Sequence, residues 1–304
     1  MAHALTFQLV CSGLAMLLVD VVTSEPLPPP PPHSQVDAST LEGKLLFGYQ
    51  GWFDTPASGA PKEGWTHWSG PNGPNATNST FDLWPCTDEL PPRSCHPTPE
   101  LTSRAASKKG QALQLFSSYP NSTADVHFRW MREYGLDGVF VQRFVNGISP
   151  GLDRDKKDGV LLHALRAAEA NGRVLSVMYD ISGAHEATWA SLILRDWRHL
   201  TQELRVTASP AFLQHGGKHV LSIWGIGFVG HPGTPASSLQ LLKDLRAVTP
   251  ITFVGGVPTH WREGKGDSKP AYDQVYVGAP RGPLHGGRST GGAPSGPLQG
   301  GGRR

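Results

Sequence analysis

Charged and amide side chains end several apolar runs in this chain of 304 residues. Gln142 and Arg143 stand at the end of one run, Tyr179 and Asp180 end another, and His260 follows a third. A charge at the end of a buried strand costs folding free energy unless it is paired or used in binding. Arg143 and Asp180 are therefore candidates for a binding site, and the alternative is a structural ion pair between the two.

Aromatic residues occur at corresponding positions after the other runs, together with a Trp-rich segment that follows the first run. Aromatic rings cover the apolar C–H faces of sugars, while carboxylates and guanidinium groups bind sugar hydroxyls. The pattern predicts a carbohydrate-binding site. Its candidate residues are Tyr49, Trp52, Trp65, His67, Trp68, Gln142, Arg143, Tyr179, Asp180, Trp224 and His260.

Hydrolysis of a glycosidic bond normally needs two carboxyl groups, about 5 to 9.5 Å apart. The sequence identifies no catalytic pair. Asp180 is the best single candidate, with Asp54 and Glu263 behind it, and each is expected only to bind a substrate hydroxyl or to act as an auxiliary carboxylate. His67 and His260 have no metal-ligand spacing with another His, Cys or carboxylate, so we expect no metal. A Gly-x-Ser-x-Gly nucleophile motif is absent from the sequence, which weakens the case for a serine hydrolase.

Five short apolar runs rich in β-branched and aromatic residues are expected to position these side chains as buried parallel strands. The runs cover residues 45–51, 138–144, 174–180, 220–228 and 251–257. Segments with three- and four-residue apolar spacing lie between them and predict helices. These segments cover residues 124–134, 159–170, 188–204 and 237–248.

Alternating strands and helices predict an α/β fold with a parallel sheet and right-handed crossovers. An open doubly wound sheet and a (β/α) barrel both fit, but no glycine-rich phosphate motif follows the first strand, which disfavours a nucleotide-binding sheet and its cofactor. A closed barrel needs eight units, so five strands predict an incomplete one. In either fold the active site lies at the carboxyl ends of the strands.

The composition excludes several classes of protein. A formal net charge of +2 gives no reason to expect a nucleic-acid partner. Three cysteines are too few for a disulfide-built miniprotein. Beyond residue 25 there is no uncharged apolar run of about 18 residues, so a polytopic membrane protein is excluded.

Both ends of the chain differ in composition from its middle. Residues 1–24 predict a secretory signal peptide or an uncleaved signal anchor, and only the anchor would place the protein on a membrane. Residues 25–40 predict a Pro-rich spacer, residues 41–278 the folded domain, and residues 279–304 a disordered Gly- and Arg-rich tail. A secreted protein is expected, with the secretory-pathway membrane as the alternative.

Three Asn-x-Ser/Thr sequons, at Asn75, Asn78 and Asn121, predict N-glycosylation. Cys86 and Cys95 lie in a Pro-rich segment, where they could close a small disulfide loop or remain free thiols. Both features fit the secretory pathway.

Several motifs carry a family resemblance, and they occur in order between about Leu41 and Tyr276. They are Gly48–Phe53, Gly64–Trp68, Phe81–Pro85, His127–Met131, Asp137–Phe144, Met178–Gly183 and Trp224–Phe228. With them the chain resembles secreted glycoside hydrolase-like proteins labelled xylosidase/arabinosidase, which are similar to the family 99 endo-α-mannosidases and the family 71 α-1,3-glucanases. The resemblance implies a TIM-type barrel that acts on glycosidic bonds without a redox cofactor.

The family's catalytic carboxylate pair lies in a late motif, of the Glu-x-x-Glu or Asp-Glu-x-Asp-Glu type, that no segment after Tyr276 matches. The resemblance therefore implies a C-terminally shortened chain, and an open fragment of a barrel is expected to be marginally stable and prone to aggregation. Three functions stay open: a glycoside hydrolase, a non-catalytic glycan-binding protein, and a secreted protein without a sugar ligand.

Overall fold

A computed structural model describes residues 35–75, 77–98 and 113–278 of the chain. The predicted leader, the first part of the predicted spacer and the predicted tail lie outside these residues. Among the described residues, no helix combines the length and apolar character that a membrane crossing requires.

The fold is α/β, built on a six-stranded sheet whose five main strands are parallel and follow one another in chain order. These strands are β1 (Leu46–Tyr49), β4 (Gly138–Phe144), β5 (Val174–Asp180), β7 (Lys218–Trp224) and β8 (Ile251–Gly256). All five match predicted strands, and β4 and β5 have the predicted bounds. The described strands leave the sheet open, with β1 and β8 as its parallel edges.

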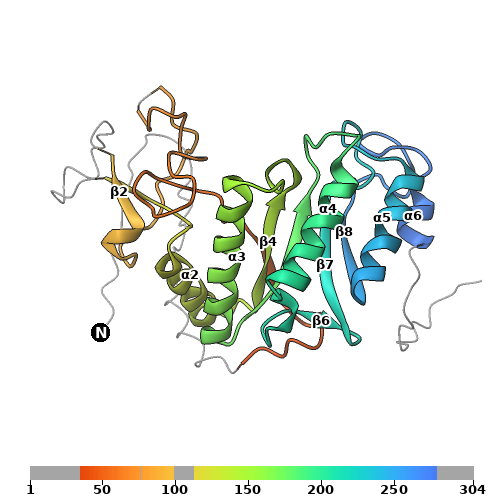
Figure 1. Cartoon of the computed structure of the whole chain (residues 1–304), viewed down its shortest axis with the longest axis horizontal. Helices are drawn as coiled ribbons and strands as arrows, with labels where there is room; N and C mark the ends of the chain where they lie inside the picture. The colour runs from red at the N-terminus through yellow and green to blue at the C-terminus, as the bar shows by residue number, and fades with distance from the viewer. Residues whose placement is uncertain (1–34, 76, 99–112, 279–304) are drawn as a thin grey trace, which may run out of the picture.

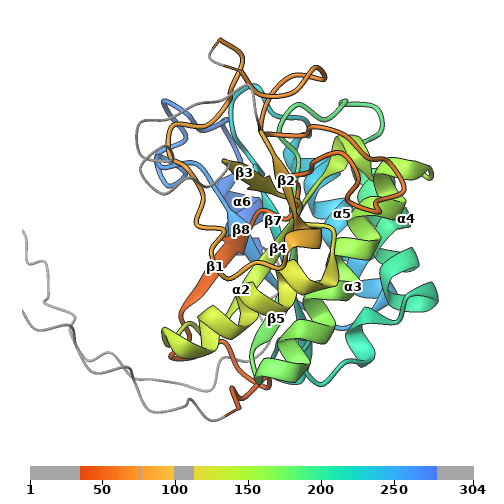
Figure 2. The ribbon, with the colours of Figure 1, turned by 90° about the vertical axis from the view of Figure 1, so that its left-hand side faces the viewer.

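A helix follows each parallel strand and, for the first four strands, precedes the next parallel strand. The helices are α2 (Asn121–Glu133), α3 (Leu152–Asn171), α4 (Trp189–Arg198), α5 (Pro235–Val248) and α6 (Asp273–Gly278), and a π-helical turn, His199–Glu203, extends α4. Figures 1 and 2 show α2, α3, α4 and α5 on the same face of the sheet. A doubly wound sheet carries helices on both faces, so helices α2 to α5 do not have the arrangement of that predicted alternative.

Smaller elements were not predicted from the sequence. In the long connection from β1 to α2, the short strands β2 (Cys95–Pro97) and β3 (Gln114–Phe116) pair antiparallel, and a one-turn helix, Pro92–Ser94, precedes them. Strand β6 (Gln214–His215) pairs antiparallel with β7. Two further single turns, Val145–Gly147 and Val206–Ala208, complete the described elements.

Local sequence explains several boundaries. Helix α3 ends where Gly172 takes a left-handed conformation with φ +61°, which glycine adopts without the steric cost of a side chain. Helix α5 begins at a capping box, in which the Thr234 side chain accepts from the Ser237 backbone N–H, and Pro235 occupies the first turn.

The main core lies between the sheet and its helices. Fully buried aromatic and aliphatic side chains fill it, among them Phe128, Leu161, Trp189 and Trp197. A second, smaller core closes the opposite face at the amino end of the sheet, where Val36, Ala38 and Leu41 pack against Val174, Leu213 and Val220. Residues 36–40, assigned to the spacer by the sequence, therefore contact the domain.

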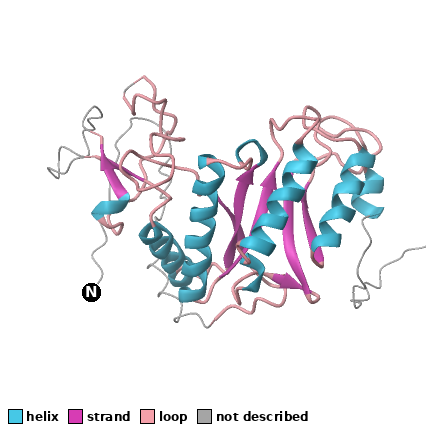
Figure 3. Cartoon of the chain, viewed as in Figure 1, coloured by secondary structure: helices cyan, strands magenta, loops and turns pink. Residues whose placement is uncertain are grey.

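With the amino end closed, the carboxyl ends of the strands remain as the place for a site. Figure 3 shows the long loops gathered at that end of the sheet.

Candidate functional site

Two polar residues meet on the face of the sheet that the helices leave uncovered. The side-chain amide of Gln142, on β4, donates to Asp180 Oδ2 over 2.8 Å, and the Ser182 backbone N–H donates to Asp180 Oδ1 over 2.8 Å. Asp180 ends β5, where it is paired in register with Trp224 of β7. Asp180 is buried, while Trp224 is 42% exposed. Gln142, Asp180 and Trp224 thus form a polar and aromatic strip across three strands.

Arg143 and Tyr179 lie on the opposite face, among the helices. Arg143 donates from Nε and Nη2 to Asp196 over 3.0 and 2.7 Å, and the Tyr179 hydroxyl donates to the same carboxylate over 2.7 Å. Arg143 Nη2 also bonds Asp158 Oδ1 at 2.9 Å. The alternative of an Arg143–Asp180 ion pair is therefore wrong. Asp180 is paired in register with Phe144, and Arg143, the neighbour of Phe144 along β4, points to the opposite face.

An aromatic stack borders the strip. Trp52, in the loop after β1, stacks on His67 with ring centroids 5.0 Å apart and contacts Phe144, at the end of β4, also at 5.0 Å. His67 has φ +61°, a left-handed conformation that costs energy for a residue with a side chain. Burial, with the positive charges of Lys156 and Lys157, lowers the pKa of His67. The stack is thus held in a strained loop.

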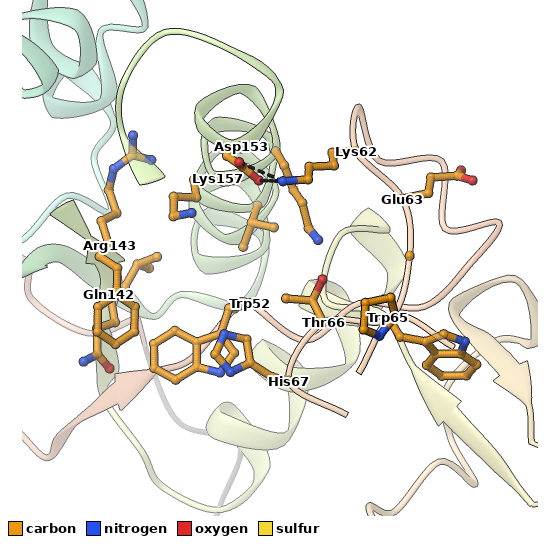
Figure 4. A pocket seen from close by; sticks show the side chains of 17 residues that line it. Trp52, Lys62, Glu63, Trp65, Thr66, His67, Gln142, Arg143, Asp153 and Lys157 are labelled. Atoms are coloured by element: carbon orange, nitrogen blue, oxygen red, sulfur yellow. Dashed lines mark hydrogen bonds and ion pairs between the residues drawn. The ribbon is translucent and has the colours of Figure 1, made fainter. Parts of the chain in front are cut away.

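A cavity of about 430 Å³ lies beside this stack. Figure 4 shows Trp52 and His67 at one side, Trp65 beyond them, and the Arg143 guanidinium turned away from Trp52. The residues that line the cavity are Gly51, Trp52, Lys62, Glu63, Gly64, Trp65, Thr66, His67, Pro71, Val141, Gln142, Arg143, Phe144, Asp153, Lys156, Lys157 and Val160.

Three further predicted binding residues lie elsewhere. Tyr49 is buried on the helix side and its hydroxyl is 3.0 Å from His127 Nδ1. Trp68 is buried within the loop, where its indole N–H donates to the Phe116 carbonyl over 2.7 Å. His260 is exposed after β8, with Nδ1 2.9 Å from Asp267 Oδ1. Tyr49 and Trp68 are corrected to packing residues, since a ring held in a core does not face a ligand.

The two auxiliary carboxylates also lie outside the cavity lining. Asp54 is fully buried and accepts from the Ser117 hydroxyl and the Lys156 ammonium, both over 2.6 Å. Glu263 is exposed in the loop after β8 and pairs with Lys265. Neither carboxylate lines the cavity.

Lysines of the cavity wall were missed from the sequence. Lys62 lies in the Trp-rich loop, and Lys156 and Lys157 lie in the second turn of α3. The signal was present: a charged run, residues 153–158, follows closely after the strand that carries Gln142. Such a run is a weak signal by itself, because charge runs on helices usually cover solvated faces.

The sequence features expected for a secreted protein can be located in the structure. Cys86 is exposed and Cys95 half-buried in β2, and both are free thiols, so of the two alternatives the structure contains the thiols and not the disulfide. Strand pairing with Phe116 fixes Cys95, while Cys86 lies in an irregular loop. Asn78 donates its side-chain amide to the Gly73 carbonyl over 2.8 Å, Asn75 lies beside it in the same loop, and Asn121 begins α2.

No protein-family model matches the chain, and no curated protein matches it. Among solved structures, the chain is similar to a GH99 endo-alpha-mannosidase from Bacteroides thetaiotaomicron, with 15% sequence identity and a TM-score of 0.38. The similarity covers 62% of this chain and 47% of that structure, so the chain spans about half the length of the structure it matches.

Proposed function

We propose that this protein binds carbohydrate at the carboxyl ends of its parallel strands, in a glycoside hydrolase-like frame of five βα units. The observation that carries the proposal is the Trp52 stack beside the hydrogen-bonded Gln142–Asp180 pair. A sugar ring can lie against an aromatic face while its hydroxyls bond to amide and carboxylate groups. The cavity of about 430 Å³ falls within the usual range for small-ligand sites, about 300 to 1,000 Å³.

Four of the predicted binding residues line this cavity besides Gln142: Trp52, Trp65, His67 and Arg143. Asp180 joins them through its bond to Gln142, and Trp224 extends the strip by one strand. In this proposal Trp52 supplies the stacking surface, Gln142 bonds a sugar hydroxyl while Asp180 orients its amide, and Trp224 contacts a further sugar unit.

Binding without hydrolysis is the form of the proposal that we favour. Hydrolysis requires one carboxyl group to protonate the leaving oxygen and another to attack or to activate water. Glu63 and Asp153, the carboxylates of the cavity wall, are already engaged: Glu63 accepts from the Ala57 and Gly59 amides, and Asp153 from Lys62. Asp180 alone does not make a catalytic pair.

Glycoside hydrolysis is the second candidate, and the position of Asp180 at the end of a buried strand favours it. Release of reducing sugar from mannans, α-glucans and arabinoxylans tests it directly. Release that is lost in Asp180→Asn would replace the binding proposal by the hydrolase.

A glycan array probed with the full chain, followed by titration of the best ligand, tests the binding proposal. We expect Trp52→Ala to weaken binding by about tenfold, since aromatic contacts contribute about 0.5–1.5 kcal/mol beyond the area they bury. Trp84→Ala is the matched control, because Trp84 is a 38% exposed loop tryptophan that does not line the cavity. Absence of any glycan ligand, or equal losses in the two variants, would refute the proposal.

The leader and the sequons add a proposal about location. We infer entry into the secretory pathway, with glycans on Asn75, Asn78 or Asn121, and a mobility shift after enzymatic deglycosylation of the secreted protein would support it.

A further inference from the structure

The cavity wall carries more positive than negative charge, and most of that charge is compensated. Lys62 Nζ bonds both oxygens of Asp153 at 2.9 Å. Lys156 Nζ bonds the buried Asp54 at 2.6 Å. Arg143 is held by Asp158 and Asp196, as described above. Each of these cations therefore has a carboxylate of its own.

Lys157 differs from its neighbours. It is half-buried in α3, and among the described residues no hydrogen-bond acceptor or carboxylate pairs with its ammonium. The nearest candidate, Asp153, is already bonded through both oxygens to Lys62. Figure 4 shows the Lys157 side chain between Arg143 and the Lys62–Asp153 pair.

The surrounding chain leaves room for this ammonium. Gly147, in the turn after β4, lies against Lys157 Nζ, and a side chain at position 147 would collide with it. Burial of the ammonium lowers the pKa of Lys157, and the positive charges of Arg143, Lys156 and Lys62 lower it further, while Asp153 acts in the opposite direction. A partly buried cation without a counter-ion is unfavourable, and a bound anion would compensate it.

The geometry points to an anionic subsite at Lys157: the sugar that stacks on Trp52 carries a negatively charged group, a uronate carboxylate or a sulfate ester, which pairs with the Lys157 ammonium. The position near the N-terminal end of α3 favours an anion as well, because the helix dipole is positive there. This inference rests on the proposed glycan binding and adds the class of sugar.

Titration of the full chain with three matched tetrasaccharides tests the inference. The probes are tetragalacturonate, its carboxyl-reduced neutral form, and a sulfated neutral form. We expect at least one anionic probe to bind about tenfold or more tightly than the neutral one, since hydrogen bonds to charged groups are the stronger class. The two anionic arms identify which group the subsite takes.

Substitution of the lysine assigns the effect to one residue. Lys157→Gln should remove the preference for the anionic probe, and Lys157→Arg should keep it. Lys243→Gln, at an exposed lysine of α5 outside the cavity, should leave it unchanged. Far-ultraviolet circular dichroism of each variant verifies that the fold is intact. If Lys157→Gln is unfolded, Lys157→Arg, which retains the charge, still tests the inference, and loss of the anionic preference in that folded variant would contradict it.

The outcomes separate this inference from the proposed function. Equal binding of the neutral and anionic probes would overturn the anionic subsite and leave glycan binding in place. Binding of none of the probes or array glycans would overturn both. If Lys157→Gln and Lys243→Gln lose the preference for the anionic probe to the same extent, the preference reflects general attraction of anions to positive surface charge, and the subsite is overturned.

Discussion

At the scale of single residues, one carboxylate organises the interior between the sheet and the helices. Asp196 of α4 is buried and accepts from both Arg143 and Tyr179. The Arg143 charge, 1% exposed, is compensated only through Asp196 and Asp158 among the described residues. Removal of Asp196 would leave a buried guanidinium with half its compensation and a buried hydroxyl without its acceptor.

We therefore expect Asp196→Ala to lower the free energy of unfolding by about 3–5 kcal/mol, the usual cost of breaking a buried ion pair by removing one partner. Chemical denaturation followed by tryptophan fluorescence measures the loss. Glu133→Gln is the control, because Glu133 pairs with Arg129 on an exposed helix face, where such a pair contributes about 0–1 kcal/mol. Similar losses in the two variants would contradict the assigned role of Asp196.

The same residues show what could be predicted of the site. The sequence places Gln142, Arg143, Tyr179 and Asp180 at strand ends, and that is where they lie. It groups them as one site, although neighbours along a strand must face opposite sides. In a strand that is apolar on both faces, the sequence has no alternation of polar and apolar residues to distinguish the two faces. Only the structure, in which α3 and α4 cover one face, separates Arg143 and Tyr179 from Gln142 and Asp180.

At the scale of elements, the approach of β4 to β5 depends on a missing side chain. A Cβ at Gly138 would overlap the Val174 backbone carbonyl. The two strands are paired along their whole length, from Gly138 opposite Val174 to Phe144 opposite Asp180. The strip that holds Gln142 against Asp180 therefore depends on a glycine at the other end of the same strands.

Gly138→Ala should destabilise the domain by about 1–3 kcal/mol or more, as overpacking against rigid backbone does. Gly48→Ala in β1 is the matched control, because its Cβ would meet only Met178 Cε, at 3.8 Å, and we expect a change of less than about 1 kcal/mol. Thermal unfolding of the two variants measures both. An unchanged midpoint in Gly138→Ala would contradict the close approach.

The elements themselves were largely predictable. The five apolar runs predict all the parallel strands, and the four amphipathic segments predict helices α2 to α5. These predictions succeed because hydrophobic periodicity and helix-terminating glycines are local features of the sequence. The β2–β3 pair was missed because three-residue strands carry no measurable period. Tryptophans outside the predicted site also differ: Trp197, on the apolar stripe of α4, is fully buried, while Trp84, in a loop, is 38% exposed.

At the scale of the whole molecule, the described sheet is bounded by two apolar edges. Phe47 of β1 is 48% exposed. Next to β8 an apolar pocket of about 190 Å³ is lined by residues that include Ile223, Phe253 and Val275. Exposed strand edges with apolar side chains favour association between molecules.

Phe47→Lys should reduce concentration-dependent self-association, because a charged side chain on an edge strand opposes pairing with another chain. Light scattering across a concentration series measures this. Leu83→Lys is the control: Leu83 is a loop leucine away from the sheet that is more exposed than Phe47, at 85%, and its substitution should change little. Equal effects of the two substitutions, or a wild-type protein that stays monomeric across the concentration series, would contradict a role of the β1 edge in self-association.

The segment that closes the amino end of the sheet has a consequence for how the chain acquires its fold. Val36 donates to the Gly172 carbonyl, Ala38 accepts from Gln214, and Leu41 bonds to His215, a residue 174 positions further along the chain. During synthesis the first of these residues leaves the ribosome long before its partners exist. Contacts between such distant parts of a chain slow folding. Residues 36–41 therefore cannot pack against the sheet until β6 and β7 have been synthesised.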